Sequence, residues 1–129
     1  MNSLQLNLDR TLIQKHSISK EIDQFMLQNQ VADMSRFKVI TCTLEAIANI
    51  FEHAKPPLKH MIVILHCDNK KIIVDLLDNS PFKALVQPNS CPAADVHSGR
   101  GLWIINNWMD SVRSQQTVAG THLQLTLTM

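Results

Sequence analysis

The stretch HMIVILHC–DNKK–IIVDLLD, at residues 60–78, decides the fold of this chain. Two short runs rich in Ile, Val and Leu flank a polar turn of Asp, Asn and Lys. Runs of this length and composition are typical of strands, and a polar turn between two of them is typical of a hairpin. The stretch therefore predicts a β-hairpin of two apolar strands, and the neighbouring segments can be interpreted outward from it.

Before the hairpin, the chain shows one strand pattern and two helix patterns. LQLNL at residues 4–8 alternates apolar and polar residues, as a half-buried strand does. Apolar residues at helical spacing predict a first helix over about residues 19–30, with Ser19 as its N-cap. The clearest helix begins near Ser35 and ends before the prolines at residues 56–57, because proline cannot continue a helix.

After the hairpin, residues 80–98 lack any sustained periodicity and are rich in Pro, Asn, Ser and Ala, which predicts a mobile loop. A short helix is expected over residues 101–109, followed by strands over about 111–117 and 121–127. The order β-α-α-β-β-loop-α-β-β favours an α+β fold in which helices cover one face of a mixed, mostly antiparallel sheet. We expect a single domain over residues 1–129.

Composition and charge exclude several classes of protein. The 129 residues carry a net charge of +1 and are 45% hydrophobic, so the chain is not disordered and has no basic field to hold a nucleic acid backbone. Its longest apolar runs are too short to span a bilayer, and its start lacks the pattern of a signal peptide. Three cysteines, Cys42, Cys67 and Cys91, form no CxxC pair. We therefore expect a reduced, cytoplasmic protein that contacts neither nucleic acid nor a membrane directly.

The clearest predicted helix carries a polar stripe, because Glu45, Asn49 and His53 are each four residues apart. An amide oxygen in such a stripe can be a ligand of Mg²⁺, which prefers oxygen. A carboxylate one turn away can accept a proton from an attacking hydroxyl. Taken alone, the stripe also fits an ordinary solvated helix face.

Two further segments carry groups that could bind a ligand. Asp78 ends the second hairpin strand, where a carboxylate can accept a hydrogen bond from an exocyclic amine such as that of adenine, although Asp is also common at the start of a turn. HSGRGLWII, at residues 97–105, is a glycine-bearing loop that leads into a helix, a combination that suits phosphates but also fits an ordinary helix start. Ile104 stands where a Rossmann fingerprint needs Gly, and the Gly-Lys-Ser/Thr of a Walker loop is absent.

Together, these segments resemble the histidine-kinase-like (GHKL) ATPases, and more narrowly their anti-sigma-factor serine/threonine kinase branch. TLEAIANIFEHA at 43–54 resembles the asparagine box, DNSPF at 78–82 the first glycine box, SGRGLWIINNWMDSV at 98–112 the second glycine box with its helix, and GTHLQL at 120–125 the closing Gly-Thr strand. The resemblance implies a two-layer α/β sandwich of the Bergerat ATP-binding type.

The resemblance also implies a role for each matched residue. Asn49 would be a ligand of the Mg²⁺ that bridges the ATP phosphates, and Glu45 would be the catalytic base for the partner's hydroxyl. Asp78 would bind the adenine amino group. The remaining expected cofactor-binding residues are His53, Ser98, Gly99, Arg100, Gly101 and Thr121, of which Gly99, Arg100 and Gly101 would wrap the phosphates and Thr121 would assist near the adenine. Residues 83–98 would form the ATP lid.

By the same resemblance, the protein would be an ATP-dependent serine/threonine kinase. It would phosphorylate a STAS-type anti-sigma-factor antagonist, sequester a sigma factor or an equivalent regulator, and form a homodimer. The alternative is an ATP-binding module that switches partners without catalysis. One residue departs from the family pattern: Ser80 stands where the first glycine box usually has Gly. If that backbone needs a positive φ, Ser80 costs about 1 kcal/mol and ATP affinity suffers.

Overall fold

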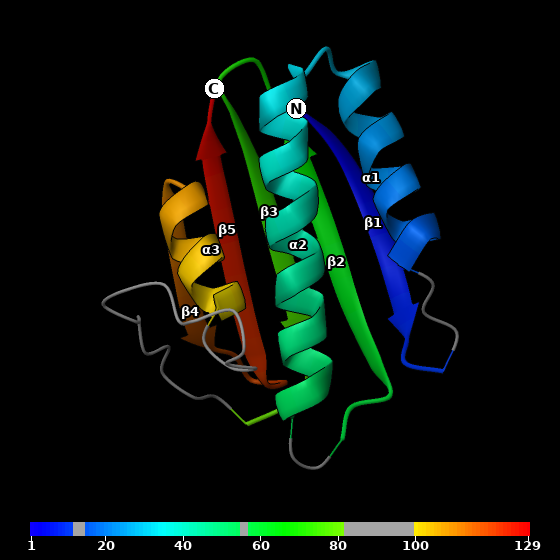
Figure 1. The fold of residues 1–129 in the computed structure, drawn as a ribbon. Coiled ribbons are helices and arrows are strands. Elements are labelled where there is room, and N and C mark those ends of the chain that lie inside the picture. The colour runs from blue at the N-terminus through cyan, green and yellow to red at the C-terminus, as the bar shows by residue number, and fades with distance from the viewer. Residues whose placement is uncertain (12–14, 55–56, 82–99) are drawn as a thin grey trace.

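The computed structural model describes residues 1–11, 15–54, 57–81 and 100–129. These residues form two layers, with all the described helices on one face of a single sheet (Figure 1). In chain order the elements are β1 (Asn2–Asp9), α1 (Lys15–Gln28), α2 (Asp33–His53), β2 (His60–Cys67), β3 (Lys71–Asp78), α3 (Arg100–Trp108), β4 (Ser111–Gln116) and β5 (Thr121–Thr128). The expected α+β sandwich with helices on one face is confirmed.

The sheet has the strand order β1-β2-β3-β5-β4, and each of its four pairings is antiparallel. It is therefore more regular than the mixed sheet that the sequence allowed. β5 pairs with β3 while β4 lies at the outer edge, so the strand that closes the chain is central rather than peripheral. This order sets Asp78, the last residue of β3, directly opposite Thr121, the first residue of β5, at the end of the sheet where α2 ends.

The core lies between the sheet and the helices. Alternate residues of the strands face the helices, and β3 shows this most clearly, because Ile72, Val74 and Leu76 are fully buried. α2 crosses the middle of the sheet and covers this face (Figure 1). Its buried side chains are Val39, Cys42, Thr43, Ala46, Ile47 and Phe51. The polar stripe lies along a flank of this buried face, where Glu45 and Asn49 are half-buried.

The helix boundaries differ from expectation at the starts of α1 and α2. α1 begins at Lys15, so the prediction that Ser19 is its N-cap is wrong. Ser19 lies inside the helix, where its hydroxyl donates a hydrogen bond of 2.9 Å to the carbonyl oxygen of His16. α2 begins at Asp33, two residues before the expected start, and ends at His53 just before the extended Ala54, as the prolines required. No helix among the described residues is both long and apolar enough to cross a membrane.

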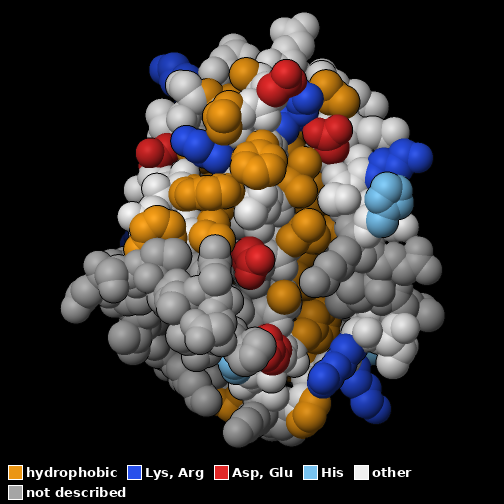
Figure 2. Space-filling model, viewed as in Figure 1, with side chains coloured by type: hydrophobic (Ala, Val, Ile, Leu, Met, Phe, Trp, Pro, Cys, Tyr) orange, Lys and Arg blue, Asp and Glu red, His pale blue; other side chains and the backbone are white. Residues whose placement is uncertain are grey.

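An aromatic contact holds α3 beside α2. The rings of Phe37 and Trp108 have centroids 5.6 Å apart in a tilted arrangement, which is a favourable geometry for aromatic pairs. Hydrophobic side chains gather over α2 and the neighbouring α3 on this side of the molecule (Figure 2). Because Trp108 is the last residue of α3, this contact fixes the end of the helix away from the glycine loop.

Candidate functional site

The start of α3 lies directly against the polar stripe of α2. A Cβ atom added to Gly101 would be 2.6 Å from Glu45 Oε2 and 3.3 Å from Asn49 Nδ2. Only a residue without a side chain fits this approach unless Glu45 moves. The structure therefore brings together Glu45, Asn49 and Gly101, which the sequence placed in two separate segments.

Glu45 and Asn49 are half-buried, and neither side chain has a hydrogen-bond or ion-pair partner among the described residues. A carboxylate and an amide oxygen form a donor set that suits Mg²⁺. Beside them, the first N–H groups of α3 have no partner within the helix and favour an anion. The arrangement can thus hold a metal ion, phosphate oxygens and a proton acceptor side by side.

His53, the third member of the stripe, lies at the last residue of α2 and is exposed. Its Nε2 atom is 4.0 Å from Oε2 of the neighbouring Glu52, at the limit of an ion pair. Nothing in the described residues joins His53 to Glu45 or Asn49, so its expected role stays a prediction.

Asp78 lies at the end of β3, and Ser80 anchors its carboxylate. Oδ1 of Asp78 accepts a hydrogen bond of 2.8 Å from the backbone N–H of Ser80 and a second one from the Ser80 hydroxyl. Oδ2 has no hydrogen-bond partner in the part of the chain that the structure describes. The hydroxyl of Thr121 donates a bond of 3.0 Å to the carbonyl oxygen of Ser80, so Asp78, Ser80 and Thr121 form one connected group.

The concern that Ser80 has a strained backbone is not supported. Among the described residues, only Gln30 and Gly120 have a positive φ, so Ser80 keeps an ordinary conformation for an L-residue. A Ser at this position therefore carries no left-handed penalty. Its hydroxyl instead adds a contact that Gly could not make.

A backbone conformation that requires glycine was expected at position 80 but is found at Gly120. Its φ is +155°, and an added Cβ would collide with the carbonyl oxygen of Asp78 and lie 2.5 Å from Cα of Asn79. Both features exclude a side chain, since the colliding atoms belong to the backbone and cannot swing away. Gly120 thus lets the turn before β5 pack tightly against the segment that carries Asp78.

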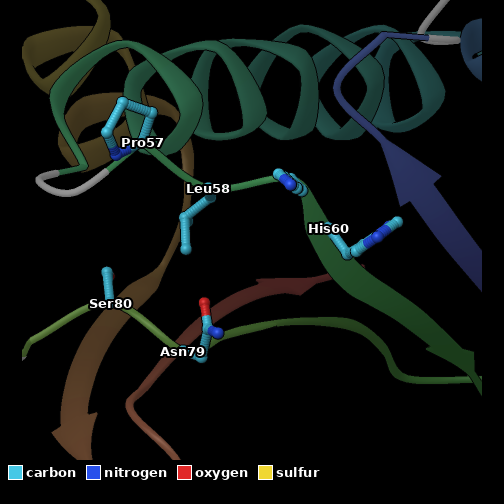
Figure 3. Close-up of a pocket in the computed structure, with 6 residues that line it drawn as sticks. Pro57, Leu58, His60, Asn79 and Ser80 are labelled. Atoms are coloured by element: carbon cyan, nitrogen blue, oxygen red, sulfur yellow. The ribbon is translucent and has the colours of Figure 1, made fainter.

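A pocket of about 310 Å³ opens beside this segment, between the connection from α2 to β2 and the end of β3 (Figure 3). Its volume is at the lower end of the range for small-molecule sites. Six residues line it: Pro57, Leu58, Lys59, His60, Asn79 and Ser80. The two residues that follow Asp78 thus form part of the wall of a cavity.

Part of the expected site lies outside the described residues. This is true of Ser98, of Gly99 and of residues 83–98, the expected lid. Arg100 is the first residue of α3, but its side chain is likewise outside the described part.

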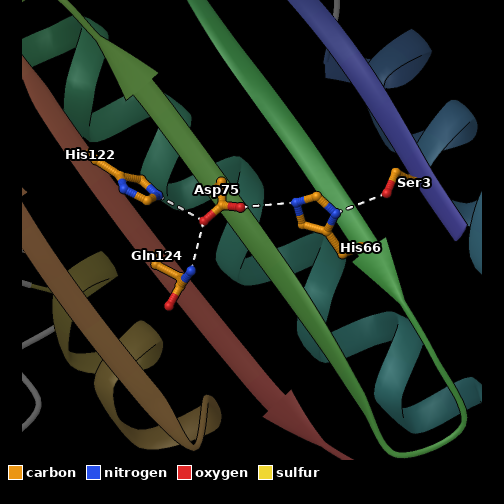
Figure 4. A network of polar contacts seen from close by, with 5 residues as sticks. All are labelled: Ser3, His66, Asp75, His122 and Gln124. Carbon is orange, nitrogen blue, oxygen red and sulfur yellow. Dashed lines mark hydrogen bonds and ion pairs between the residues drawn. The ribbon is translucent and has the colours of Figure 1, made fainter. Parts of the chain in front are cut away.

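A second polar cluster lies on the face of the sheet away from the helices, and sequence reasoning missed it (Figure 4). Asp75 accepts hydrogen bonds from His122 (2.7 Å) and Gln124 (2.9 Å) on Oδ1, and contacts His66 Nε2 (3.0 Å) through Oδ2. His66 Nδ1 is in turn 2.8 Å from the hydroxyl of Ser3. No group of three or more His, Cys, Asp or Glu in the described chain is arranged to hold a metal ion, so the cluster is a hydrogen-bond network.

Comparison with known proteins identifies the family. Among curated proteins, no relative matches this chain. The family model described as the histidine kinase-like ATPase domain matches residues 10–127, which begin just after β1 and stop one residue before the end of β5. The match includes both helix segments that meet at Gly101 and the strand end that carries Asp78. The chain therefore belongs to the family of histidine kinase-like ATPase domains.

Proposed function

We propose that the protein binds ATP with Mg²⁺ and transfers phosphate to a serine or threonine of a partner protein, as an anti-sigma-factor-type kinase. The observation that carries this proposal is the position of Gly101 against Glu45 and Asn49. Phosphoryl transfer depends mainly on positioning and electrostatics, and it needs a metal ligand, a phosphate cradle and a base in one place. Residues suited to these three tasks meet at this contact.

The proposal gives each of these residues a task. Asn49 would hold Mg²⁺, which when bound neutralises charge on the phosphates. The backbone at the start of α3 would donate hydrogen bonds to phosphate oxygens, and Asp78 would accept one from the adenine amino group. Glu45 would take the proton of the attacking hydroxyl, because its carboxylate lies beside Gly101 at the start of α3, where the phosphates would bind.

The proposed partners follow from the resemblance to the anti-sigma branch. The phosphate acceptor would be a STAS-type anti-sigma-factor antagonist, and a sigma factor or an equivalent regulator would be held in an inactive complex. Such a kinase would act in the cytoplasm and form a homodimer.

The test compares two variants of the polar stripe in the full chain. ATP–Mg²⁺ binding is measured by calorimetry, and phosphotransfer by incubation with radiolabelled ATP and a candidate STAS antagonist. Asn49→Ala should impair both Mg²⁺-dependent ATP binding and transfer, because it removes the metal ligand. Glu45→Ala should bind ATP nearly as the wild type does and should transfer phosphate about 10²–10⁴-fold more slowly, since a general base is lost.

Glu52→Ala provides a matched control on the same helix, because the Glu52 carboxylate is largely exposed, with a side-chain exposure of 65%. This variant should leave both binding and transfer near the wild-type values. If Glu45→Ala phosphorylates the antagonist at the wild-type rate, Glu45 is not the base. If the wild type does not bind ATP, the nucleotide assignment itself is wrong.

One observation favours the alternative, a partner-switching module that binds ATP without catalysis. A catalytic base is usually oriented by a further group, and Glu45 has no such partner among the described residues. Wild-type protein that binds ATP and captures its partner, yet transfers no phosphate to a cognate antagonist, would establish this alternative.

A further inference from the structure

The Ser80 hydroxyl donates a hydrogen bond to one oxygen of the Asp78 carboxylate, the group that is expected to bind the adenine amino group. Both the backbone N–H and the hydroxyl of Ser80 donate to Oδ1 of Asp78, the former at 2.8 Å. Two donors on one oxygen restrain rotation of the carboxylate about its Cβ–Cγ bond, because rotation would break both hydrogen bonds. Oδ2, which has no partner in the described chain, is then the acceptor that stays available in one defined direction.

Ser80 is itself held in place from β5. Thr121 donates a hydrogen bond of 3.0 Å to the Ser80 carbonyl oxygen, and Thr121 is also the strand partner of Asp78. Gly120 packs its backbone closely against Asp78 and Asn79, which leaves little room for the end of β3 to move toward β5. The anchor of Asp78 is thus tied to β5 and is not an isolated turn.

The same segment borders an open space. Asn79 and Ser80 line the pocket of about 310 Å³, whose opposite side includes the buried Leu58 (Figure 3). Asp78, whose carboxylate Ser80 anchors, directly precedes these two lining residues, so a flat heterocycle in this partly apolar cavity would lie beside the segment that carries the carboxylate.

We propose that Ser80 is a positioning residue that aims Oδ2 of Asp78 at the exocyclic amino group of a purine and thereby sets the preference for adenine nucleotides. This inference rests on the proposed ATP binding. It adds a specificity role for a residue that had counted as a departure from the family pattern. Gly at position 80 would keep the backbone hydrogen bond and lose the hydroxyl one, so it would leave the carboxylate more weakly oriented.

The experiment measures the selectivity of the full chain for the amino group. Calorimetry gives the Kd of ATP and of purine riboside triphosphate, which is the same nucleotide without the 6-amino group, both with Mg²⁺. The wild type should prefer ATP. Ser80→Ala and Ser80→Gly should each lower this preference about tenfold, mostly by weakening ATP, since one charge-assisted hydrogen bond that orients the acceptor is lost. Ser80→Thr, which keeps a hydroxyl, should retain the preference.

Asn79→Ala is the matched control, because Asn79 lines the same pocket without bonding to Asp78 in the described structure. It should change the two affinities by the same factor. Wild-type selectivity in Ser80→Ala would overturn the inference, and so would an equal loss of both nucleotides, which indicates a purely structural role. Thermal denaturation checks that each variant folds. If Ser80→Ala does not fold, Ser80→Gly provides the test. If the wild type does not bind ATP, both the proposed function and this inference are wrong. If it binds ATP but the Ser80 variants keep its selectivity, only this inference is wrong.

Discussion

Gly101 lies against the carboxylate of Glu45, so close that a Cβ on the glycine would be 2.6 Å from Glu45 Oε2. The contact joins the first turn of α3 to the middle of α2, two segments that the hairpin separates in the sequence. A larger residue at position 101 would meet Oε2 of Glu45, which is the end of a flexible side chain. Such a substitution should therefore affect function more than folding. A side chain at position 101 can be accommodated, but only by moving the proposed base.

Gly101→Ala should therefore slow phosphotransfer at least tenfold while leaving the fold intact. Alanine is a better helix former than glycine by up to about 1 kcal/mol, so the unfolding free energy should stay constant or rise. The displaced Glu45 carboxylate would no longer lie where it can take the proton. Single-turnover transfer and urea denaturation of the same preparations measure the two effects.

The double variant Glu45→Ala with Gly101→Ala separates this mechanism from a general disturbance. If Gly101→Ala acts by displacing Glu45, it should cause little further loss once the carboxylate is absent, which gives a large coupling energy. Additive losses in the two variants would contradict the mechanism.

Most of the fold could be predicted because its signals are local. The hairpin, the closing strands and α2 each have a clear period and clear ends. The start of α1 could not be placed by the same reasoning, because the preference of Ser19 for an N-cap conflicted with the apolar spacing. Ile18, Ile22 and Met26 are all buried and lie four residues apart, so Ile18 belongs to the apolar stripe and the helix had to begin before it.

The candidate site was predictable where four-residue spacing or a motif placed a side chain, as for Glu45, Asn49 and Asp78. The contacts of Ser80 were not, because its hydroxyl bond depends on a turn conformation that sequence does not specify. Nor was the cluster around Asp75, whose side chains come from four different strands. Alternation places Asp75 on the open face, but its contact with His122 requires the pairing of β3 with β5, which are not consecutive in the chain.

Gly120→Ala should destabilise the protein by about 1–3 kcal/mol, because both its φ of +155° and the surrounding backbone oppose a Cβ. The substitution should also displace Asp78, because the added methyl group would collide with the backbone of Asp78 and Asn79. Urea denaturation measures the loss of stability, and ATP calorimetry measures the effect on the site. Val118→Ala, in the same turn and fully exposed, should stay within about 0.5 kcal/mol of the wild type. An equally mild effect of Gly120→Ala would show that the turn can relax.

The Asp75 cluster should make stability fall at acidic pH. Burial alone would raise the pKa of Asp75, but hydrogen bonds from His122 and Gln124, the charge of His122 and the hydrogen bond with His66 together lower it below the ordinary value of 3.8. A carboxylate with a lowered pKa in the folded state stabilises the fold above its ordinary pKa, and this contribution is lost as the pH falls through the folded value. Wild-type unfolding free energy should thus drop from about pH 4 downward, whereas Asp75→Asn should lose this part of the pH dependence.

Chemical denaturation between pH 2.5 and about pH 7 provides the comparison. Gln124→Ala is a useful intermediate, because it removes one neutral donor to Asp75 and adds no titrating group. It should weaken the acid dependence without abolishing it. The same slope in the wild type and Asp75→Asn would show that other groups control the loss of stability.

Cys42 should be unreactive in the folded protein and should report on the opening of α2. Burial, and then the negative charge of Glu45, raise the pKa of the Cys42 thiol to about 12. Because alkylation requires the thiolate, iodoacetamide at pH 8 should label Cys42 only when α2 separates from the sheet. Labelling followed by peptide mass spectrometry should show protection in buffer and complete reaction in denaturant. If the proposed nucleotide binds to α2 in the folded state, ATP–Mg²⁺ should slow the labelling further, and the Asn49→Ala variant should lose that extra protection. Rapid labelling of Cys42 in the native wild type would contradict the tight packing of α2 on the sheet.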